Sequence, residues 1–324
     1  MKNPTSSTRP LALVVLLLSG LILFSGCSGV IAAPTPTVTP TLDPTVPLPS
    51  STSTPVPSPT STSTATITPT ATWAVQGPGR LVCPILLYHH IDVAPATDSA
   101  TAREYYVPRE EFEAQLKALH EWGYSTISMS QLAKAILYGA AIPAHPIVIT
   151  FDDGNLDVYQ NAFPLMQNYG FIGVAYIVTN TLHADGYMNP DQLKELAAAG
   201  WEIGSHSMTH ADLRQSPDRL EMESAQSRVL LQDAIGAEVR TFAYPYGLDD
   251  AAVTRQVQKD GYLDAAGLGG SWFQGPYNLY SLSRRPVKGG ITLETFASYL
   301  PWHGPATPMP AASATLTLQG TFPP

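Results

Sequence analysis

Carboxylates and imidazoles that could act together are concentrated in two short runs of this 324-residue chain. Asp152 and Asp153 stand side by side in the run TFDDG at 150–154, and His206 and His210 begin and end the run HSMTH. One carboxylate of such a pair can ligate a cation while the other takes a proton from an attacking water. One carboxylate and two imidazoles form a three-ligand set, which leaves a position open for water, as in catalytic zinc sites. These residues predict a metal-assisted hydrolase.

The first run stands where a strand should end. Residues 146–151 are apolar and rich in β-branched side chains, which is typical of a buried strand, and Gly154 lets the chain turn out of it. Where a strand becomes a loop, neighbouring side chains can be turned toward one cavity. His206 and His210 are four residues apart, so a helical turn or a converging loop brings both to one side. Each run alone is also typical of a solvated turn or of surface histidines, so the prediction depends on their combination.

Three motifs in order resemble the polysaccharide deacetylases, the NodB-homology domains of carbohydrate esterase family four. The motifs are TFDDG at 150–154, EIGSHS at 202–207 with its second histidine, and FAYPYG at 242–247. The resemblance covers about residues 80–301. It implies removal of N-acetyl groups from an N-acetylglucosamine-containing polysaccharide with a divalent metal. Zinc is the expected metal, and the ligand set is also compatible with cobalt or nickel.

The resemblance also implies roles for individual residues. Asp152 would be the general base. Asp153 would bind the metal, together with His206 and His210. Tyr246, the residue after the proline of the third motif, would give its backbone N–H to the oxyanion.

The third motif departs from the family pattern. Many members carry an arginine two residues before its proline, where it pairs with the catalytic base, and this chain has Ala243. Arg284, in the run LSRRPV, resembles the Leu-Pro-Arg run of a subgroup that lacks the usual arginine. We therefore expect Arg284 to orient Asp152. The alternative is an exposed arginine in a basic doublet.

The usual general acid of the family, a histidine in a Leu-x-His run near the end of the domain, has no match. His303, the only histidine after His210, has a different spacing. The apolar run at 84–88 ends in His89 and His90, and it resembles the Tyr-His run of the subgroup that deacetylates poly-N-acetylglucosamine. We predict that His89, at the matching position, protonates the leaving amine, because histidine titrates near neutrality. A purely structural histidine, or His303 as the acid, remain the alternatives.

Strand-like and helix-like segments alternate through the domain, which predicts a parallel sheet. Expected strands are 84–88, 124–127, 146–151, 171–178, 201–204 and 241–244, and expected helices are 108–123, 130–138, 156–169, 189–200 and 217–235. The chemical motifs fall just after strands, where a (β/α) barrel builds its active site. An open doubly wound sheet alternates likewise. The family resemblance selects an α/β fold, a distorted (β/α) barrel of seven or eight strands.

The N-terminus predicts export. Two cations precede the apolar run 11–24, and small residues follow it, an order typical of a secretory signal. The run before Cys27 resembles a bacterial lipobox. We expect residues 1–27 to be a signal peptide and Cys27 to carry a lipid that anchors the protein to a membrane outside the cytoplasm. A secreted form, or an uncleaved anchor, is the alternative.

Composition sets the remaining boundaries. Thr, Pro and Ser dominate the chain before the domain, so we expect a disordered tether at 28–79, the deacetylase domain at 80–301 and a loose tail at 302–324. If Cys27 is lipidated, Cys83 has no partner for a disulfide within the chain. A net charge of −9 without a basic cluster argues against nucleic acid as a partner.

Two rival functions stay open. A glycan-binding lipoprotein with a decayed site fits the missing arginine and the missing C-terminal histidine, although the retained Asp152 argues against it. A barrel amidohydrolase acting on small amides is the second rival, which the long tether makes less natural. Peptidoglycan, poly-N-acetylglucosamine and chitin share the acetamide, so the sequence does not select the polymer.

Overall fold

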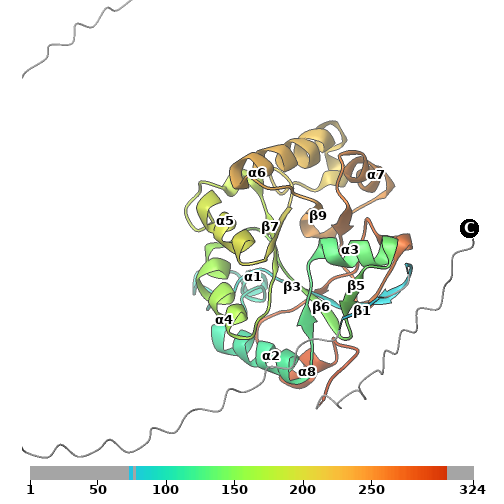
Figure 1. The fold of residues 1–324 in the computed structure, drawn as a ribbon. Coiled ribbons are helices and arrows are strands. Elements are labelled where there is room, and N and C mark those ends of the chain that lie inside the picture. The colour runs from blue at the N-terminus through green and yellow to red at the C-terminus, as the bar shows by residue number, and fades with distance from the viewer. Residues whose placement is uncertain (1–72, 76–77, 305–324) are drawn as a thin grey trace, which may run out of the picture. The chain divides into compact units, whose positions relative to one another are not determined.

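The computed structural model describes residues 73–75 and 78–304 (Figure 1). The expected signal peptide at 1–27, the expected tether up to residue 72 and the tail from 305 lie outside the described residues. Among the helices of the described part, none combines the length and the apolar composition needed to cross a bilayer.

Parallel strands curl into a distorted barrel. Their spatial order is β10-β9-β8-β7-β6-β3-β12, and β4 (Ser125–Thr126) pairs with the start of β6 beside this path. The strands on the path are β3 Ile85–Tyr88, β6 Pro146–Phe151, β7 Val174–Ile177, β8 Glu202–Ser205, β9 Thr241–Ala243, β10 Asp264–Ala266 and β12 Arg285–Pro286. The prediction of a distorted α/β barrel of seven or eight strands is confirmed, and an open doubly wound sheet is excluded.

One extended segment, residues 282–286, joins the two edges of the curled sheet. At its start Leu282 forms a parallel bridge to Ala266, the last residue of β10. At its end β12 pairs with β3. Arg284 therefore lies inside the ring of strands, and its side chain is completely buried.

Amphipathic helices cover the outside of the barrel (Figure 1). They are α1 Ala100–Arg103, α2 Arg109–Glu121, α3 Met129–Tyr138, α4 Phe163–Asn168, α5 Pro190–Ala198, α6 Ser227–Ile235, α7 Ala251–Lys259 and α8 Leu293–Ala297. In α2 the apolar residues recur at three- and four-residue spacing, so Phe112, Leu116 and Leu119 all face the barrel and are buried. Capping residues set the helix ends, as at α3, where Ser128 accepts from the Gln131 N–H and the Gln131 side chain accepts from the Ser128 N–H.

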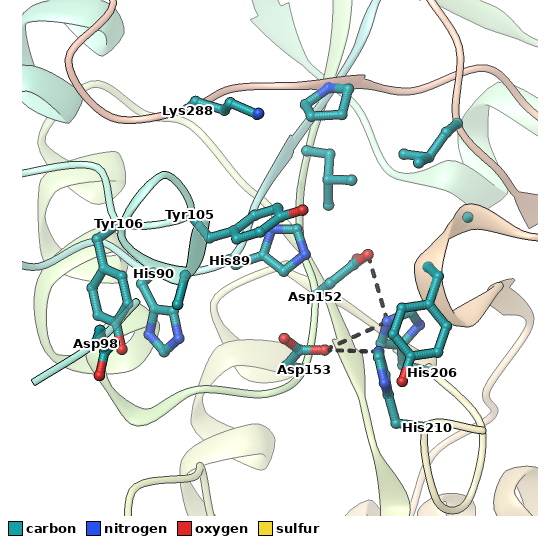
Figure 2. A pocket seen from close by; sticks show the side chains of 16 residues that line it. His89, His90, Asp98, Tyr105, Tyr106, Asp152, Asp153, His206, His210 and Lys288 are labelled. Atoms are coloured by element: carbon teal, nitrogen blue, oxygen red, sulfur yellow. Dashed lines mark ion pairs between the residues drawn. The ribbon is translucent and has the colours of Figure 1, made fainter. Parts of the chain in front are cut away.

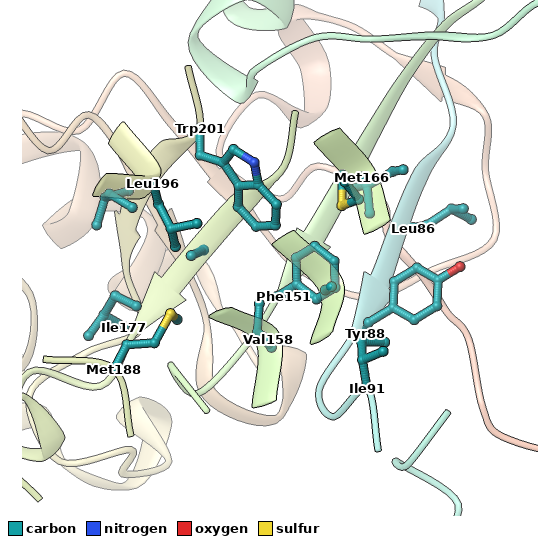
Figure 3. Close-up of a cluster of buried hydrophobic side chains, with 14 of the residues drawn as sticks. Leu86, Tyr88, Ile91, Phe151, Val158, Met166, Ile177, Met188, Leu196 and Trp201 are labelled. Atoms are coloured by element: carbon teal, nitrogen blue, oxygen red, sulfur yellow. The ribbon is translucent and has the colours of Figure 1, made fainter. Parts of the chain in front are cut away.

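Strand β6 separates two apolar layers. Ile147, Ile149 and Phe151 pack in the cluster between strands and helices that Figure 3 shows in part, whereas Val148 belongs to a second cluster. This alternation places the side chain of Thr150 on the opposite face from Phe151. Asp152, two residues after Thr150, continues on the face that looks into the barrel.

The expected long helix at 217–235 is broken into several pieces. A 3₁₀ turn at Pro217–Arg219 is followed by a π-helical turn at Met222–Gln226 and only then by α6. The break has a local cause, because the hydroxyl groups of Ser224 and Ser227 donate to the carbonyl oxygens of residues four earlier. A second π-helical turn, Val158–Ala162, precedes α4. Such turns are frequent at functional sites. Asp157 directly precedes this second turn and contacts His90, and Glu223 lies within the first turn and accepts from the N–H groups of Met208 and Thr209.

Both ends of the folded part extend past the expected boundaries at 80 and 301. Before residue 80, strand β1 (Trp73–Val75) pairs with β5 (Ala141–Pro143). Inside the expected domain, β2 (Leu81–Val82) pairs with β11 (Phe273–Gln274). At the other end the indole of Trp302 stacks on His145 with ring centroids 4.7 Å apart. Strand pairing and aromatic stacking hold residues for which composition alone predicts a tether and a tail.

Candidate active site

The carboxyl ends of the barrel strands surround a pocket of about 390 Å³ (Figure 2). The predicted site residues in its lining are His89, Asp152, Asp153, His206, His210 and Tyr246. They follow β3, β6, β8 and β9, so residues far apart in the sequence meet because parallel strands end at the same edge of the sheet. The remaining predicted residue, Arg284, lies behind Asp152.

Asp153, His206 and His210 converge on one point. Oδ1 of Asp153 lies 3.5 Å from Nε2 of His206 and 3.4 Å from Nε2 of His210. Ligand atoms at zinc bond lengths and tetrahedral angles would be about 3.4 Å apart. The same Oδ1 is buried and accepts no hydrogen bond, which is unusual for a carboxylate unless a cation completes its environment. The three residues therefore fit a divalent metal.

The protonation of the two imidazoles also suits metal binding. Nδ1 of the buried His206 lies 2.8 Å from the carbonyl oxygen of Ala243 and donates to it, which leaves the Nε2 lone pair facing Asp153. Ala243, where the third motif of many family members has an arginine, thus contributes its backbone carbonyl oxygen to the orientation of His206. Burial and the neighbouring His206 lower the pKa of His210, which favours its neutral form.

Backbone strain is concentrated at this site. In the described part of the chain the non-glycine residues with positive φ are Asp153 at 73°, Ser207 at 67°, His210 at 60° and Tyr246 at 60°. Such conformations cost on the order of 1–3 kcal/mol each and persist only where the surroundings impose them. The strain therefore marks the same residues that the motifs select.

Glu223 imposes the shape of the loop at 207–210, although no sequence motif contains it. Its buried carboxylate accepts from the N–H groups of Met208 at 3.1 Å and Thr209 at 2.9 Å, and from the Thr209 hydroxyl at 2.6 Å. Arg219 donates to the other side of the carboxylate at 2.8 Å. The loop ends are joined by the His210 N–H, which donates to the Ser207 hydroxyl. The only sequence signal of this network is the four-residue spacing of Arg219 and Glu223.

Asp152 forms a two-pronged ion pair with Arg284. Nη1 and Nη2 of the arginine lie 2.6 and 2.8 Å from the two carboxylate oxygens, and both side chains are buried. Nε donates to the carbonyl oxygen of Gly267, and Nη1 also reaches the Thr150 hydroxyl. Burial alone would raise the pKa of Asp152, but Arg284 and His206 together lower it to about 2. The alternative of an exposed Arg284 is wrong, because the closing segment 282–286 carries the side chain into the barrel.

His89 and His90 diverge after β3. His89 lines the pocket beside the two aspartates, partly buried, with its ring edge-on to Tyr105 at 4.7 Å (Figure 2). Burial lowers the pKa of His89, and the charges of Asp152 and Asp153 oppose this effect. His90 lies further from the metal ligands, and its Nδ1 is 2.6 Å from a carboxylate oxygen of Asp157. Of the two imidazoles, His89 is the one placed among the reactive carboxylates.

His303 lies at the opposite end of the barrel. Its neighbour Trp302 stacks on His145, which directly precedes β6, and forms hydrogen bonds with the Tyr124 hydroxyl. Asp152 directly follows β6. A strand of this length spans about 20 Å, so His303 lies far from the pocket.

Tyr246 forms the wall of the pocket next to His210. Its ring packs edge-on against His210 with centroids 4.6 Å apart, and the side chain is 58% exposed. Gly247 follows with φ 67°, and a Cβ there would lie 2.1 Å from the Leu268 side chain. This glycine lets the turn after Pro245 pass close to Leu268, which also lines the pocket.

Comparisons with known proteins agree with this geometry. The family model described as polysaccharide deacetylase matches residues 140–264, which include all three motifs. A Bacillus subtilis (strain 168) protein provisionally named a polysaccharide deacetylase is 27% identical over 233 residues, covering 71% of this chain and 80% of that protein. The poly-beta-1,6-N-acetyl-D-glucosamine N-deacetylase of Staphylococcus aureus (strain MRSA252) is 26% identical over 47% of this chain and 57% of its own length. A solved polysaccharide deacetylase from Bacillus cereus is similar at a TM-score of 0.59 and 27% identity, covering 68% of this chain and 69% of that one.

Proposed function

We propose that this chain is a member of the polysaccharide deacetylase family and removes N-acetyl groups from a polysaccharide that contains N-acetylglucosamine. The reaction hydrolyses the acetamide C–N bond, depends on a divalent metal and takes place outside the cytoplasm. Its products are acetate and a glucosamine unit.

One observation carries this proposal. A carboxylate that is not part of the three-ligand set, Asp152, is held by Arg284 at the edge of the pocket that contains Asp153, His206 and His210. A non-catalytic protein that only bound a glycan or a metal would not need a second carboxylate held in a fixed orientation. A general base beside a metal is what amide hydrolysis requires.

Each residue then has a task. When bound by Asp153, His206 and His210, a divalent metal supplies positive charge that polarises the acetamide and lowers the pKa of water. Asp152 takes the proton of the attacking water, and Arg284 keeps both carboxylate oxygens in place.

The two remaining tasks concern the developing charges. The backbone N–H of Tyr246 donates to the oxyanion that forms at the carbonyl carbon. His89 gives a proton to the departing amine. Zinc is the proposed metal, since one carboxylate and two imidazoles with an open position are typical of catalytic zinc sites.

The Arg284–Asp152 pair weakens the rival of a decayed glycan-binding protein. The arginine missing at Ala243 is replaced by Arg284 from the closing segment 282–286, so its absence is no sign of decay. The similarity to the Staphylococcus aureus enzyme favours poly-N-acetylglucosamine over chitin and peptidoglycan as the polymer.

Acetate release from those three polymers tests the proposal. Zinc-loaded protein should release acetate from at least one polymer, and the Asp152→Asn variant should release far less at equal zinc content. Zinc-loaded, folded wild-type protein that releases no acetate from any of them would overturn the proposal.

The location is proposed from the N-terminus, where Cys27 is taken to carry the lipid. In a bacterial host the wild-type chain should fractionate with membranes, and Cys27→Ser should be released as a soluble exported form. Equal membrane retention of both would contradict the lipid anchor and favour an uncleaved apolar segment.

A further inference from the structure

The guanidinium of Arg284 rests on an aromatic ring inside the barrel. Its central carbon lies 5.3 Å from the ring centroid of Tyr176 on β7, and neither side chain is exposed to solvent. Asp152, Gly267 and Thr150 accept four hydrogen bonds from the same guanidinium. The π face of Tyr176 therefore supplies a contact that the polar partners do not, and a buried cation and ring attract each other more strongly than an exposed pair.

Tyr176 is itself fixed at its far end by a chain of hydrogen bonds. Its hydroxyl lies 2.7 Å from Oγ1 of Thr241, which donates to Oδ1 of Asp264 at 2.6 Å. Because the Thr241 proton is directed to Asp264, the Tyr176 hydroxyl donates to Thr241. The three residues belong to β7, β9 and β10. These hydrogen bonds therefore connect the Tyr176 ring to two strands that lie beyond β8 in the sheet.

The intervening strand β8 is shaped to admit this ring. Gly204 stands between Tyr176 and Thr241, and a Cβ there would lie 2.5 Å from the Tyr176 ring and 2.8 Å from the methyl group of Thr241. Any larger residue would displace the ring from its place under Arg284. The absence of a side chain at Gly204 thus leaves the space that the Tyr176 ring occupies.

We propose that Tyr176 is a positioning residue for the general base: its ring holds the Arg284 guanidinium at the angle at which both nitrogens reach Asp152. The inference rests on the proposed function, in which Asp152 takes the proton of the attacking water. Tyr176 is not among the residues that line the pocket and acts only through Arg284. The hydroxyl fixes the ring, and the π face does the positioning.

Two substitutions distinguish the role of the Tyr176 ring from that of its hydroxyl group. Tyr176→Leu removes the π face, and we expect kcat to fall on the order of tenfold while KM and the zinc content stay close to wild type. Tyr176→Phe keeps the face and should retain most of the activity. A packing defect alone would lower the amount of folded protein without changing kcat per bound zinc.

Tyr262 offers a matched control, because it is a buried tyrosine under another arginine, Arg228 at 5.4 Å, away from the pocket. Tyr262→Leu should lower stability and leave kcat per bound zinc unchanged. A double-mutant cycle with Arg284→Lys adds the decisive comparison. If Tyr176 acts through Arg284, the losses in kcat are non-additive, whereas independent effects add.

The outcomes are distinct for the two claims. A wild-type protein without acetate release defeats the proposed function. An active wild type with Tyr176→Leu at the same kcat, or with additive losses in the cycle, defeats the positioning role alone. Equal losses in Tyr176→Leu and Tyr262→Leu would also defeat it.

Discussion

Two neighbouring aspartates are held in different environments. Asp152 keeps the alternation of β6, points into the barrel and pairs with Arg284. Asp153 adopts a left-handed conformation that turns its carboxylate toward the histidines, and its side chain is 28% exposed. One step along the backbone thus separates a carboxylate neutralised by a protein cation from one whose buried oxygen accepts no hydrogen bond.

This separation predicts different losses for the two amide variants. Asp152→Asn should keep about one equivalent of zinc and lose kcat by a factor of about 10² or more, as expected for a general base. Asp153→Asn should lose both zinc and activity, as should His206→Ala. Elemental analysis of chelator-free protein and acetate release measure the two quantities. Equal zinc loss in both aspartate variants would refute the division of roles.

The histidines at the two ends of the barrel allow a paired test of the general acid. His89→Ala should bind zinc normally and lose turnover, with the smallest loss on substrates whose leaving group needs no protonation. His303→Ala should keep full activity, because His303 lies near the start of β6. A fully active His89→Ala would remove the acid role from His89, and a dead His303→Ala would transfer it.

The predicted metal site depends on the loop at 207–210, which the π-helical turn Met222–Gln226 holds through Glu223. Glu223→Gln keeps the side chain's size but weakens its bonds to the loop at 207–210, so zinc affinity should fall roughly 10- to 100-fold, as for other residues that orient metal ligands. Zinc competition with a chelator measures this. Glu221→Gln, an exposed neighbour, is the control and should retain wild-type affinity. Unchanged affinity in Glu223→Gln would show that the loop holds its shape without this carboxylate.

The sequence predicts the elements of the barrel better than the contacts that orient its site. The periodicity of the expected helix 108–123 and the apolar run 146–151 predict α2 and β6 well, and the first two motifs select the predicted metal ligands Asp153, His206 and His210. The irregular turns within the expected helix 217–235 could not be predicted. In a sequence, serines whose hydroxyl groups distort a helix cannot be distinguished from serines on its surface. The support by Glu223 and Tyr176 depends on tertiary distances that no local pattern encodes.

At the scale of the whole molecule, a buried acid makes stability depend on pH. Asp264 is completely buried and one of its oxygens has no partner, so burial, aided by the charge of Glu202, raises its pKa well above the ordinary value. In the unfolded chain it ionises at about pH 3.9. Because the pKa is higher in the folded state, the stabilising contribution is complete below that pH and is lost as the pH rises toward the folded pKa.

Asp264→Asn should remove this dependence. The free energy of unfolding of the variant, minus that of the wild type, should increase between pH 5 and 8 by up to about 1.4 kcal/mol per pH unit, measured by urea unfolding. The difference cancels the titration of the shared groups that do not interact with Asp264, which leaves Asp264 and the neighbouring Glu202. Asp185→Asn, at an exposed position, should show no such trend. A constant difference for Asp264→Asn would mean that the buried carboxyl ionises in the folded protein as it does in the unfolded chain.

Because residues 282–286 close the barrel and carry Arg284, the order of synthesis determines when the proposed catalytic site is complete. Arg284 follows its partner Asp152 by 132 residues, whereas all metal ligands precede residue 211. A chain that leaves the ribosome or crosses a membrane N-terminus first presents the complete ligand set long before the cation that orients the base. In the proposed mechanism, a chain that stops before Arg284 therefore contains every predicted metal ligand but lacks the cation that orients the base, so activity requires synthesis through the closing segment 282–286.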